Sequence, residues 1–272
     1  MKQFKGKVAA ITGAGSGIGR ALALDLASRG CHVALSDINE EALAETVSQC
    51  EGWAVKVTSQ RLDVADRDAV FEWASSVKDS HGTANLIFNN AGVGLKSKVA
   101  ATTMEDFNWL MNINFWGVVY GTQAFLPILE ASGSGHVVNI SSVFGLVSVP
   151  SQSVYNAAKF AVRGYTDALR MELEIDKSCV SATTIHPGGI KTNIARNART
   201  DSSLPPANPD EFDKLAKTTP EQAATQILKA VQRNRRRAVI GPDGRLIDLL
   251  SRLPAVVPQK ITIAAARKEL KR

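Results

Sequence analysis

The chain has 272 residues, of which 44% are hydrophobic and 21% are charged, and its formal net charge is +6. These proportions are those of a folded globular protein and exclude collagen-like and globally disordered chains. The N-terminal residues do not resemble a signal peptide, and no segment is apolar for long enough to span a membrane, so we expect a cytoplasmic protein.

Short β-branched runs alternate with longer segments of helical periodicity along most of the chain. The expected strands are residues 8–12, 32–36, 54–62, 86–89, 136–140, 180–185 and 237–240. The expected helices are residues 17–29, 39–51, 66–81, 104–111, 113–131, 153–176 and 221–233. We expect Asn39 or Asp37 to cap the second helix and Pro127 to break or kink the fifth. The sequence Gly241-Pro242-Asp243-Gly244 predicts a turn.

This alternation predicts an α/β fold with a doubly wound, Rossmann-type, seven-stranded parallel sheet and helices on both faces. The strands are apolar without polar alternation, as in sheets that are covered on both sides. We expect one domain over residues 1–245, with its largest insertion at about 190–219, and a C-terminal tail at 246–272. The apolar residues of the tail could pack on the core, contact a second subunit or lie on a membrane surface.

A glycine-rich segment lies between the first expected strand and the first expected helix. Its pattern is Gly13-x-x-x-Gly17-x-Gly19. Glycines there allow a tight turn and a close approach of the backbone to a pyrophosphate, and the helix N-terminus supplies free N–H groups. The segment therefore predicts dinucleotide binding by Gly13, Gly15, Ser16, Gly17, Ile18 and Gly19.

Asp37 ends the second expected strand, where a carboxylate can accept hydrogen bonds from the adenosine ribose hydroxyls. It would repel a 2′-phosphate, and its neighbours Ser36, Ile38 and Asn39 are not basic; position 16 is a serine. These residues favour NAD(H) as cofactor, with NADP(H) as the alternative. Asp37 could also simply cap the following helix.

Tyr155 and Lys159 are four residues apart in the expected helix 153–176, which places both on one face. The pKa of a free tyrosine is about 10, and a neighbouring ammonium lowers it. Ser142 follows the expected strand 136–140 at the carboxyl edge, where open α/β sheets bind ligands. Tyr155 and Ser142 are thus two candidate donors to one substrate oxygen, with Ser141 as the alternative serine that bonds only to backbone.

These motifs together resemble those of the short-chain dehydrogenase/reductase family, in its standard-length branch. The resemblance also rests on Thr12, Asp63-Val64, Asn89-Asn90-Ala91-Gly92, Asn114 and Pro187-Gly188-x-x-x-Thr192, in family order over about residues 5 to 195. It implies an oxidoreductase that transfers a hydride between a nicotinamide cofactor and a ketone or alcohol.

The resemblance also implies residue roles. Tyr155 would be the general acid in reduction and the base in oxidation, and Ser142 would hold the substrate oxygen. Lys159 would lower the pKa of Tyr155 and bind the nicotinamide ribose, and Asn114 would hold a water that relays protons. Besides the glycine segment and Asp37, the residues implied in cofactor binding are Ile38, Asp63, Val64, Asn90, Ala91, Gly92, Tyr155, Lys159, Pro187, Gly188, Ile190 and Thr192.

Loops at residues 93–95, 143–147 and 190–204 are expected to shape the substrate site, the last of them as part of a lid at about 190–219. The first two are mostly apolar, which favours an apolar ketone or secondary alcohol. The candidate substrate-contacting residues are Ser142, Phe144, Val149, Tyr155 and Gly189. An NADPH-dependent carbonyl reductase and a non-enzymatic nucleotide sensor on the same scaffold are the alternative functions.

Partners other than the substrate are also indicated by the sequence. The resemblance implies a homodimer or homotetramer that is joined through the helices at residues 114–131 and 153–176. The basic run from Arg233 to Arg237 has no interleaved aromatic residues, so we expect no nucleic-acid binding. The four histidines lack metal-ligand spacing, so no metal site is expected. Peripheral membrane contact by the tail remains an alternative.

Overall fold

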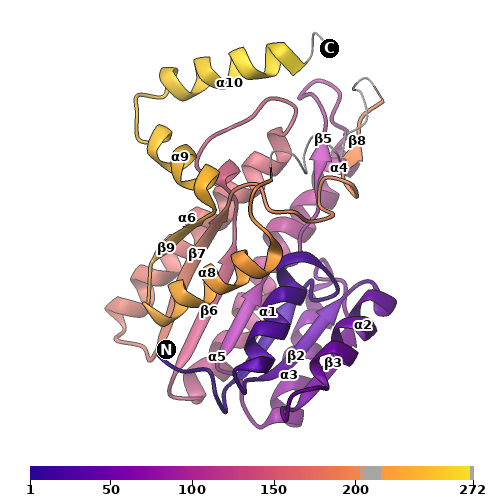
Figure 1. Cartoon of the computed structure of the whole chain (residues 1–272), viewed down its shortest axis with the longest axis vertical. Coiled ribbons are helices and arrows are strands. Elements are labelled where there is room, and N and C mark those ends of the chain that lie inside the picture. The colour runs from indigo at the N-terminus through magenta and orange to yellow at the C-terminus, as the bar shows by residue number, and fades with distance from the viewer. Residues whose placement is uncertain (203, 205–215, 270–272) are drawn as a thin grey trace.

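The computed structural model describes residues 1–202, 204 and 216–269, and its main sheet has seven parallel strands (Figure 1). In spatial order the strands are β3 (Val57–Arg61), β2 (His32–Asp37), β1 (Val8–Thr12), β4 (Leu86–Asn89), β6 (Gly135–Ile140), β7 (Val180–Pro187) and β9 (Arg237–Ile240). The predicted single-domain, doubly wound fold is confirmed. Strand order reverses between β1 and β4, and open α/β sheets bind ligands beyond the carboxyl ends of the strands at such a reversal.

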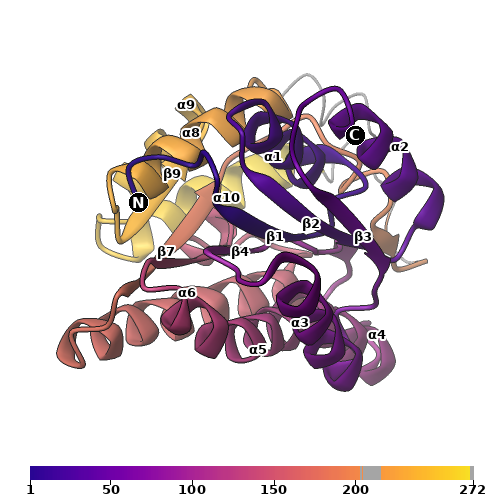
Figure 2. The same cartoon turned by 90° about the horizontal axis from the view of Figure 1, so that it is seen from below.

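Helices cover both faces of the sheet (Figure 2). One layer consists of α1 (Gly17–Ser28), α2 (Glu40–Cys50) and α8 (Pro220–Gln232), and the other of α3 (Arg67–His81), α5 (Gly117–Ala131) and α6 (Ser153–Ile175). Each layer encloses its own apolar core. Leu22 of α1 and Ile227 of α8 are fully buried on one side, and Trp73 of α3 packs edge-on against Phe125 of α5 on the other.

Helix starts follow the expected capping chemistry. The side chain of Asn39 accepts a hydrogen bond from the Ala42 backbone N–H, so Asn39, and not Asp37, caps α2. Thr219 begins α8 with a reciprocal capping box that includes Gln222. These local bonds satisfy N–H groups that the first turn of a helix leaves unpaired.

Several predicted boundaries were wrong. β3 is shorter than the expected strand at 54–62, because residues 51–55 form a turn after α2. β7 continues to Pro187, since its edge pairs with β9 as far as Ile240. The predicted turn at Gly241–Gly244 is instead the start of α9 (Pro242–Leu250), with Pro242 at the first helical position, where its missing N–H costs nothing.

The region between β4 and β6 contains an unexpected helical transition. α4 (Met104–Met111) leads through one π-helical turn, Asn112–Trp116, directly into α5, where two separate helices were predicted. α5 then runs through Pro127 without interruption. Single π turns inside α-helices are frequently found at functional sites.

A small second sheet, which periodicity did not predict, lies near the carboxyl edge of the main one. It pairs β5 (Leu95–Lys96) with β8 (Arg199–Thr200), and so fixes part of the predicted 190–219 lid against the chain that follows β4. Arg199 also pairs with Asp106 at 2.9 Å and lies over the Trp109 ring. Residues 203 and 205–215 of the predicted lid lie outside the described residues.

The C-terminal tail forms α9 and α10 (Val256–Glu269), which lie beyond one end of the sheet (Figure 1). Exposed apolar side chains continue along both helices, among them Leu246, Leu249, Val256 and Ile261. In the part of the chain that the structure describes, no helix is both long and apolar enough to cross a bilayer.

Candidate active site

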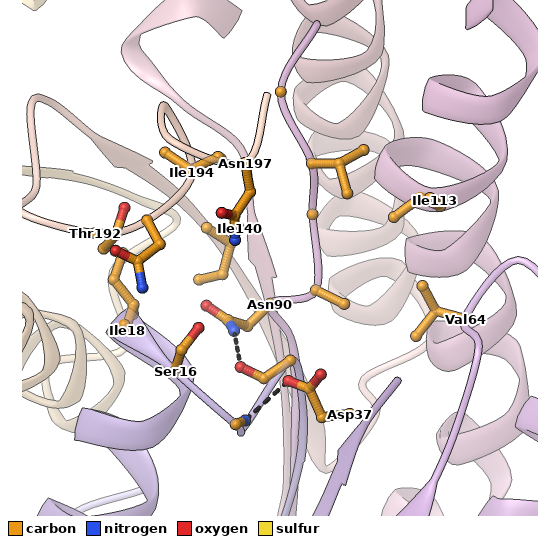
Figure 3. Close-up of a pocket in the computed structure, with 18 of the residues that line it drawn as sticks. Ser16, Ile18, Asp37, Val64, Asn90, Ile113, Ile140, Thr192, Ile194 and Asn197 are labelled. Atoms are coloured by element: carbon orange, nitrogen blue, oxygen red, sulfur yellow. Dashed lines mark hydrogen bonds between the residues drawn. The ribbon is translucent and has the colours of Figure 1, made fainter. Parts of the chain in front are cut away.

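A cavity of about 530 Å³ opens at the carboxyl edge of the sheet, across the reversal between β1 and β4 (Figure 3). Val64 and Ile113 line one wall, and Ile18 and Thr192 face them from the other. Its described lining includes Gly13, Gly15, Ser16, Gly17, Ile18, Asp37, Ile38, Asp63, Val64, Asn90, Ala91, Gly92, Ser142, Tyr155, Lys159, Pro187, Gly188, Ile190 and Thr192. Segments far apart in the sequence therefore meet in one site.

The glycine segment forms a backbone cradle at one wall of this cavity. Gly13 and Gly17 have φ values of +65° and +52°, which side-chain-bearing residues rarely adopt. A Cβ at Gly19 would lie 2.0 Å from the Gly13 carbonyl oxygen, so only glycine lets α1 start this close to the turn. Gly13, Gly15 and Gly17 line the cavity while Gly19 lies behind it, and this open backbone at a helix N-terminus fits a pyrophosphate.

The carboxylate of Asp37 marks the end of the cavity nearest α2. Asp37 Oδ2 accepts a 2.8 Å hydrogen bond from the Gly15 N–H (Figure 3). Its Oδ1 accepts one of 2.9 Å from the Asn39 N–H. Asp37 therefore ties the glycine segment to the end of β2. Lys159, at the opposite end, is the one cation among the described residues that line the cavity.

Thr12 and Asn90 join the glycine segment to the chain that follows β4. The hydroxyl of Thr12 accepts 3.0 Å hydrogen bonds from the backbone N–H groups of Asn90 and Ala91. The amide of Asn90 donates in return to the carbonyl oxygens of Thr12 and Gly13. This exchange fixes the floor of the cavity at the point where strand order reverses.

Ser142, Tyr155 and Lys159 converge at the end of the cavity opposite Asp37. Ser142 follows β6, and its hydroxyl accepts a hydrogen bond from the Phe144 N–H and makes one with the Tyr155 hydroxyl. The Ser141 hydroxyl instead donates to the Lys159 backbone carbonyl at 2.7 Å. Ser141 therefore bonds to backbone, as was expected of the serine that does not hold the substrate. The Lys159 ammonium donates to the Ile140 carbonyl at 3.0 Å and lies 5.5 Å from the centre of the Tyr155 ring.

Burial shifts the pKa values of Tyr155 and Lys159 in opposite directions. It raises the pKa of Tyr155 to about 12, although the hydrogen bond with Ser142 lowers it in part. It lowers the pKa of Lys159 to about 8. The net shift of the Tyr155 pKa is upward, opposite to the lowering that was expected from Lys159, so Tyr155 keeps its proton at neutral pH.

Asn114 is placed by the π-helical turn and does not line the cavity itself. Its side-chain oxygen accepts from the Val93 N–H and its amide donates to the Val93 carbonyl, both at 2.8 Å. Val93 does line the cavity. The side chain of Asn114 therefore holds the cavity wall, a role that its motif did not reveal.

His186 lies directly behind Ser142, and sequence reasoning missed it. It is fully buried in β7, and its Nδ1 lies 2.8 Å from the Ser142 carbonyl oxygen. Burial lowers the pKa of His186 to about 4, so the neutral ring donates this hydrogen bond. The only signal available in the sequence was a histidine within an apolar strand.

Three predicted substrate-contacting residues lie away from the described cavity lining, namely Phe144, Val149 and Gly189. Phe144 packs edge-on against the Tyr155 ring, with centroids 6.1 Å apart, and the Val149 carbonyl accepts a hydrogen bond from the Asn156 side-chain amide. Asn193, Ile194 and Asn197 line the cavity and belong to the predicted 190–204 loop, whereas the lining residues Asn39, Ala42, Leu62 and Ile113 were not assigned to the site from the sequence. Nothing in their local sequence distinguishes them from rim residues.

Within the described part of the chain, no group of three or more His, Cys, Asp or Glu side chains lies close enough to hold an ion. Polar chemistry at the site thus comes from hydroxyl, amide, ammonium and carboxylate groups.

Comparison with known proteins decides the family. The family model described as short chain dehydrogenase matches residues 7–203. The chain belongs to the short-chain dehydrogenase family. Within that family it is 46% identical over 270 residues to the putative oxidoreductase SadH of Mycobacterium tuberculosis, with 98% of each chain covered. It is 30% identical to estradiol 17-beta-dehydrogenase 11 of Macaca fascicularis, covering 98% of this chain and 84% of the relative.

A solved member of the family supports the fold and the cofactor class. A short-chain dehydrogenase/reductase from Burkholderia phymatum, in complex with NAD, superposes with a TM-score of 0.84 at 32% identity, covering 92% of this chain and 94% of the other. Levodione reductase superposes with a TM-score of 0.79 at 28% identity, covering 90% and 99%. The protein is therefore an oxidoreductase of this family, and use of a nicotinamide dinucleotide fits its cavity.

Proposed function

We propose that the protein interconverts an apolar ketone and its secondary alcohol with NAD(H) as cofactor. The observation that carries this proposal is the convergence of Ser142, Tyr155 and Lys159 at one end of a cavity whose other end presents Asp37. A dinucleotide that spans this cavity would meet the glycine cradle at its pyrophosphate and Asp37 at its adenosine ribose. Further contacts are proposed for Ile38, Asp63, Val64 and the Asn90–Gly92 segment.

The chemistry at the other end follows from the donors present. NAD(H), when bound, supplies or accepts the hydride. Ser142 and Tyr155 present two hydroxyl donors that meet at one point, where they would bind a carbonyl oxygen and stabilise the charge that develops on it. Tyr155 holds a proton at neutral pH and delivers it to that oxygen in reduction. Lys159, held by the Ile140 carbonyl, supplies the adjacent positive charge.

The preference for NAD(H) over NADP(H) rests on the adenosine end of the cavity. The Asp37 carboxylate would lie against a 2′-phosphate, and like charges at contact distance repel by several kcal/mol at an effective dielectric constant of about 20. Neither Ser16 nor Ile38, the lining residues on either side, offers a cation in compensation. NAD in the solved relative from Burkholderia phymatum supports the same choice.

The apolar substrate class rests on the side chains around the reactive end. Val93 and Ile194 line the cavity near this end, and Phe144 packs on the ring of Tyr155 behind the lining. Such a lining excludes water and favours a substrate whose one polar group is the reacting oxygen. Two relatives, an estradiol dehydrogenase and a levodione reductase, carry names that support alcohol–carbonyl interconversion as the reaction.

Assembly into a homodimer or homotetramer is proposed for the layer of α5 and α6. Large apolar residues are exposed on α6 and in the π-helical turn before α5, with exposed fractions between 39% and 76%: Trp116, Phe160, Met171 and Ile175. Exposed aromatic and methionine side chains are enriched at subunit contacts. Sedimentation of the wild type against a Phe160→Asp variant tests this assignment, with loss of the oligomer expected in the variant.

The proposed function is tested by titrating the purified protein with NADH and with NADPH while following nicotinamide fluorescence. A panel of apolar ketones and secondary alcohols is then assayed with the wild type and with Tyr155→Phe. We expect tighter binding of NADH, and a kcat reduced by roughly 10²–10⁴-fold in the variant with little change in NADH affinity. Tighter binding of NADPH would overturn the assignment of Asp37, and equal turnover by the variant would overturn that of Tyr155.

A further inference from the structure

The loop that follows β7 is anchored by residues from the C-terminal part of the chain. Gly188 donates its N–H to the Ile240 carbonyl at 3.0 Å, and Lys191 donates to the Thr218 carbonyl at 3.0 Å. Between them, the Gly189 N–H donates to Asp243 Oδ2 at 2.6 Å. Of these three anchors, the Asp243 contact is made by a side chain, and a hydrogen bond to a charged acceptor is about twice as strong as one between neutral groups.

The carboxylate of Asp243 fits closely against this loop. A Cβ at Gly188 would lie 2.3 Å from Oδ2, and one at Gly241 would lie 2.8 Å from Oδ1. Glycine at positions 188 and 241 therefore leaves the room that the carboxylate occupies. Asp243 is also in the first turn of α9, where the free N–H groups of the helix favour a negative charge (Figure 1).

One oxygen of this carboxylate is left unpaired. Asp243 Oδ1 is buried and has no hydrogen-bond partner among the residues that the structure describes. A buried acceptor without a partner costs free energy. The hydrogen bond of Asp243 with the Gly189 N–H is therefore kept in spite of this cost.

The loop lies at the reactive end of the cavity. β7 pairs with β6 up to Ile185 opposite Ile140, so Pro187 and Gly188 lie next to Ser142, and both line the cavity. β1, β4 and β6 lie between β7 and β2, which ends in Asp37, so the two strands are four interstrand spacings apart. At about 4.8 Å per spacing this separation is roughly 19 Å. A displacement of the loop at Gly188 and Gly189 would therefore affect the nicotinamide end of a bound dinucleotide more than the adenosine end.

We propose that Asp243 is a positioning residue, which holds the 187–192 loop in the conformation that binds the nicotinamide ring. This inference rests on the proposed function, because it assumes that a nicotinamide dinucleotide occupies the cavity. Asp243 would not touch the reacting atoms. It would instead couple the cofactor site to the first turn of the C-terminal helices.

The test compares the affinities of NADH and ADP-ribose, which lacks the nicotinamide ring. For Asp243→Ala we expect the Kd of NADH to rise about 10-fold or more and that of ADP-ribose to change by less than about 2-fold. Asp243→Asn keeps an oxygen acceptor for the Gly189 N–H, so it should restore most of the NADH affinity. Asp248→Ala is the matched control on the same helix, because the Asp248 carboxylate pairs with Arg237 and Arg252.

A second variant separates loop positioning from general damage to the fold. Gly188→Ala should weaken NADH binding because its methyl group meets the carboxylate, and adding Asp243→Ala should produce little further loss. Equal losses for NADH and ADP-ribose in Asp243→Ala, or unchanged NADH affinity, would overturn the proposal. A wild type that binds neither ligand would overturn the proposed function itself, and this inference with it.

Discussion

The clamp between Asn114 and Val93 offers a test of how the site is supported. Asn114→Ala removes two hydrogen bonds of 2.8 Å and strands a backbone N–H and carbonyl at the cavity wall. Each bond contributes about 1 kcal/mol net, and each stranded group adds to the loss. We therefore expect the free energy of unfolding to fall by about 3 kcal/mol. At roughly 2–4 °C per kcal/mol for a chain of this size, the Tm should fall by about 6–12 °C.

The assay is thermal and urea unfolding followed by circular dichroism, alongside steady-state kinetics. Asn112→Ala is the matched control, because Asn112 is an exposed asparagine in the same π-helical turn. Asn114→Asp keeps the acceptor for the Val93 N–H but loses the donor to the Val93 carbonyl, so it should resemble the alanine variant. If the Asn114→Ala and Asn112→Ala proteins unfold at the same temperature, the clamp does not support the wall as argued.

Three further predictions follow from the charges at the site. Because the pKa of Lys159 is lowered to about 8, ketone reduction should hold up to about pH 8 and decline above it, as a pH profile of kcat/KM would show; an unchanged rate at pH 9.5 would contradict this. Burial lowers the pKa of His186 to about 4, so the folded state binds fewer protons than the unfolded state, and stability that is complete above about pH 6.5 should be lost as the pH falls toward 4. The loss amounts to roughly 3 kcal/mol by the shift in pKa, and urea unfolding of His186→Asn should show a shallower dependence on pH than the wild type. Asp37→Ala combined with Ile38→Arg should shift the ratio of NADPH to NADH affinity by about 100-fold or more, and an unmoved ratio would show that Asp37 is not the selector.

Local patterns in the sequence were sufficient for the fold and for much of the site. The alternation of apolar runs and helical periodicity predicted all seven main strands, because both signals depend on neighbouring residues. The spacing of Tyr155 and Lys159 on one helix, and the glycine segment at a strand–helix junction, are local in the same sense. The comparisons with known proteins then confirmed the family that these motifs resemble.

Contacts between distant segments were decided only when the sheet assembled. Asn114 holds Val93 because a π turn points it there, and His186 lies behind Ser142 because β6 and β7 are neighbours. Asp243 lies where the sequence predicted a turn and the structure has the start of a helix. Its side chain contacts a loop that lies some fifty residues earlier in the chain. No local spacing encodes such pairs.

The difference between the features that the sequence predicted and those that it did not has a physical origin. Helix periodicity, capping residues and glycine turns express the preferences of a few adjacent residues, and those preferences act wherever the segment lies. Supporting contacts instead satisfy individual donors and acceptors that become buried only in the folded chain. The sequence by itself therefore determined which chemical groups the protein carries to the edge of the sheet, and the tertiary structure decided which residues hold them in place.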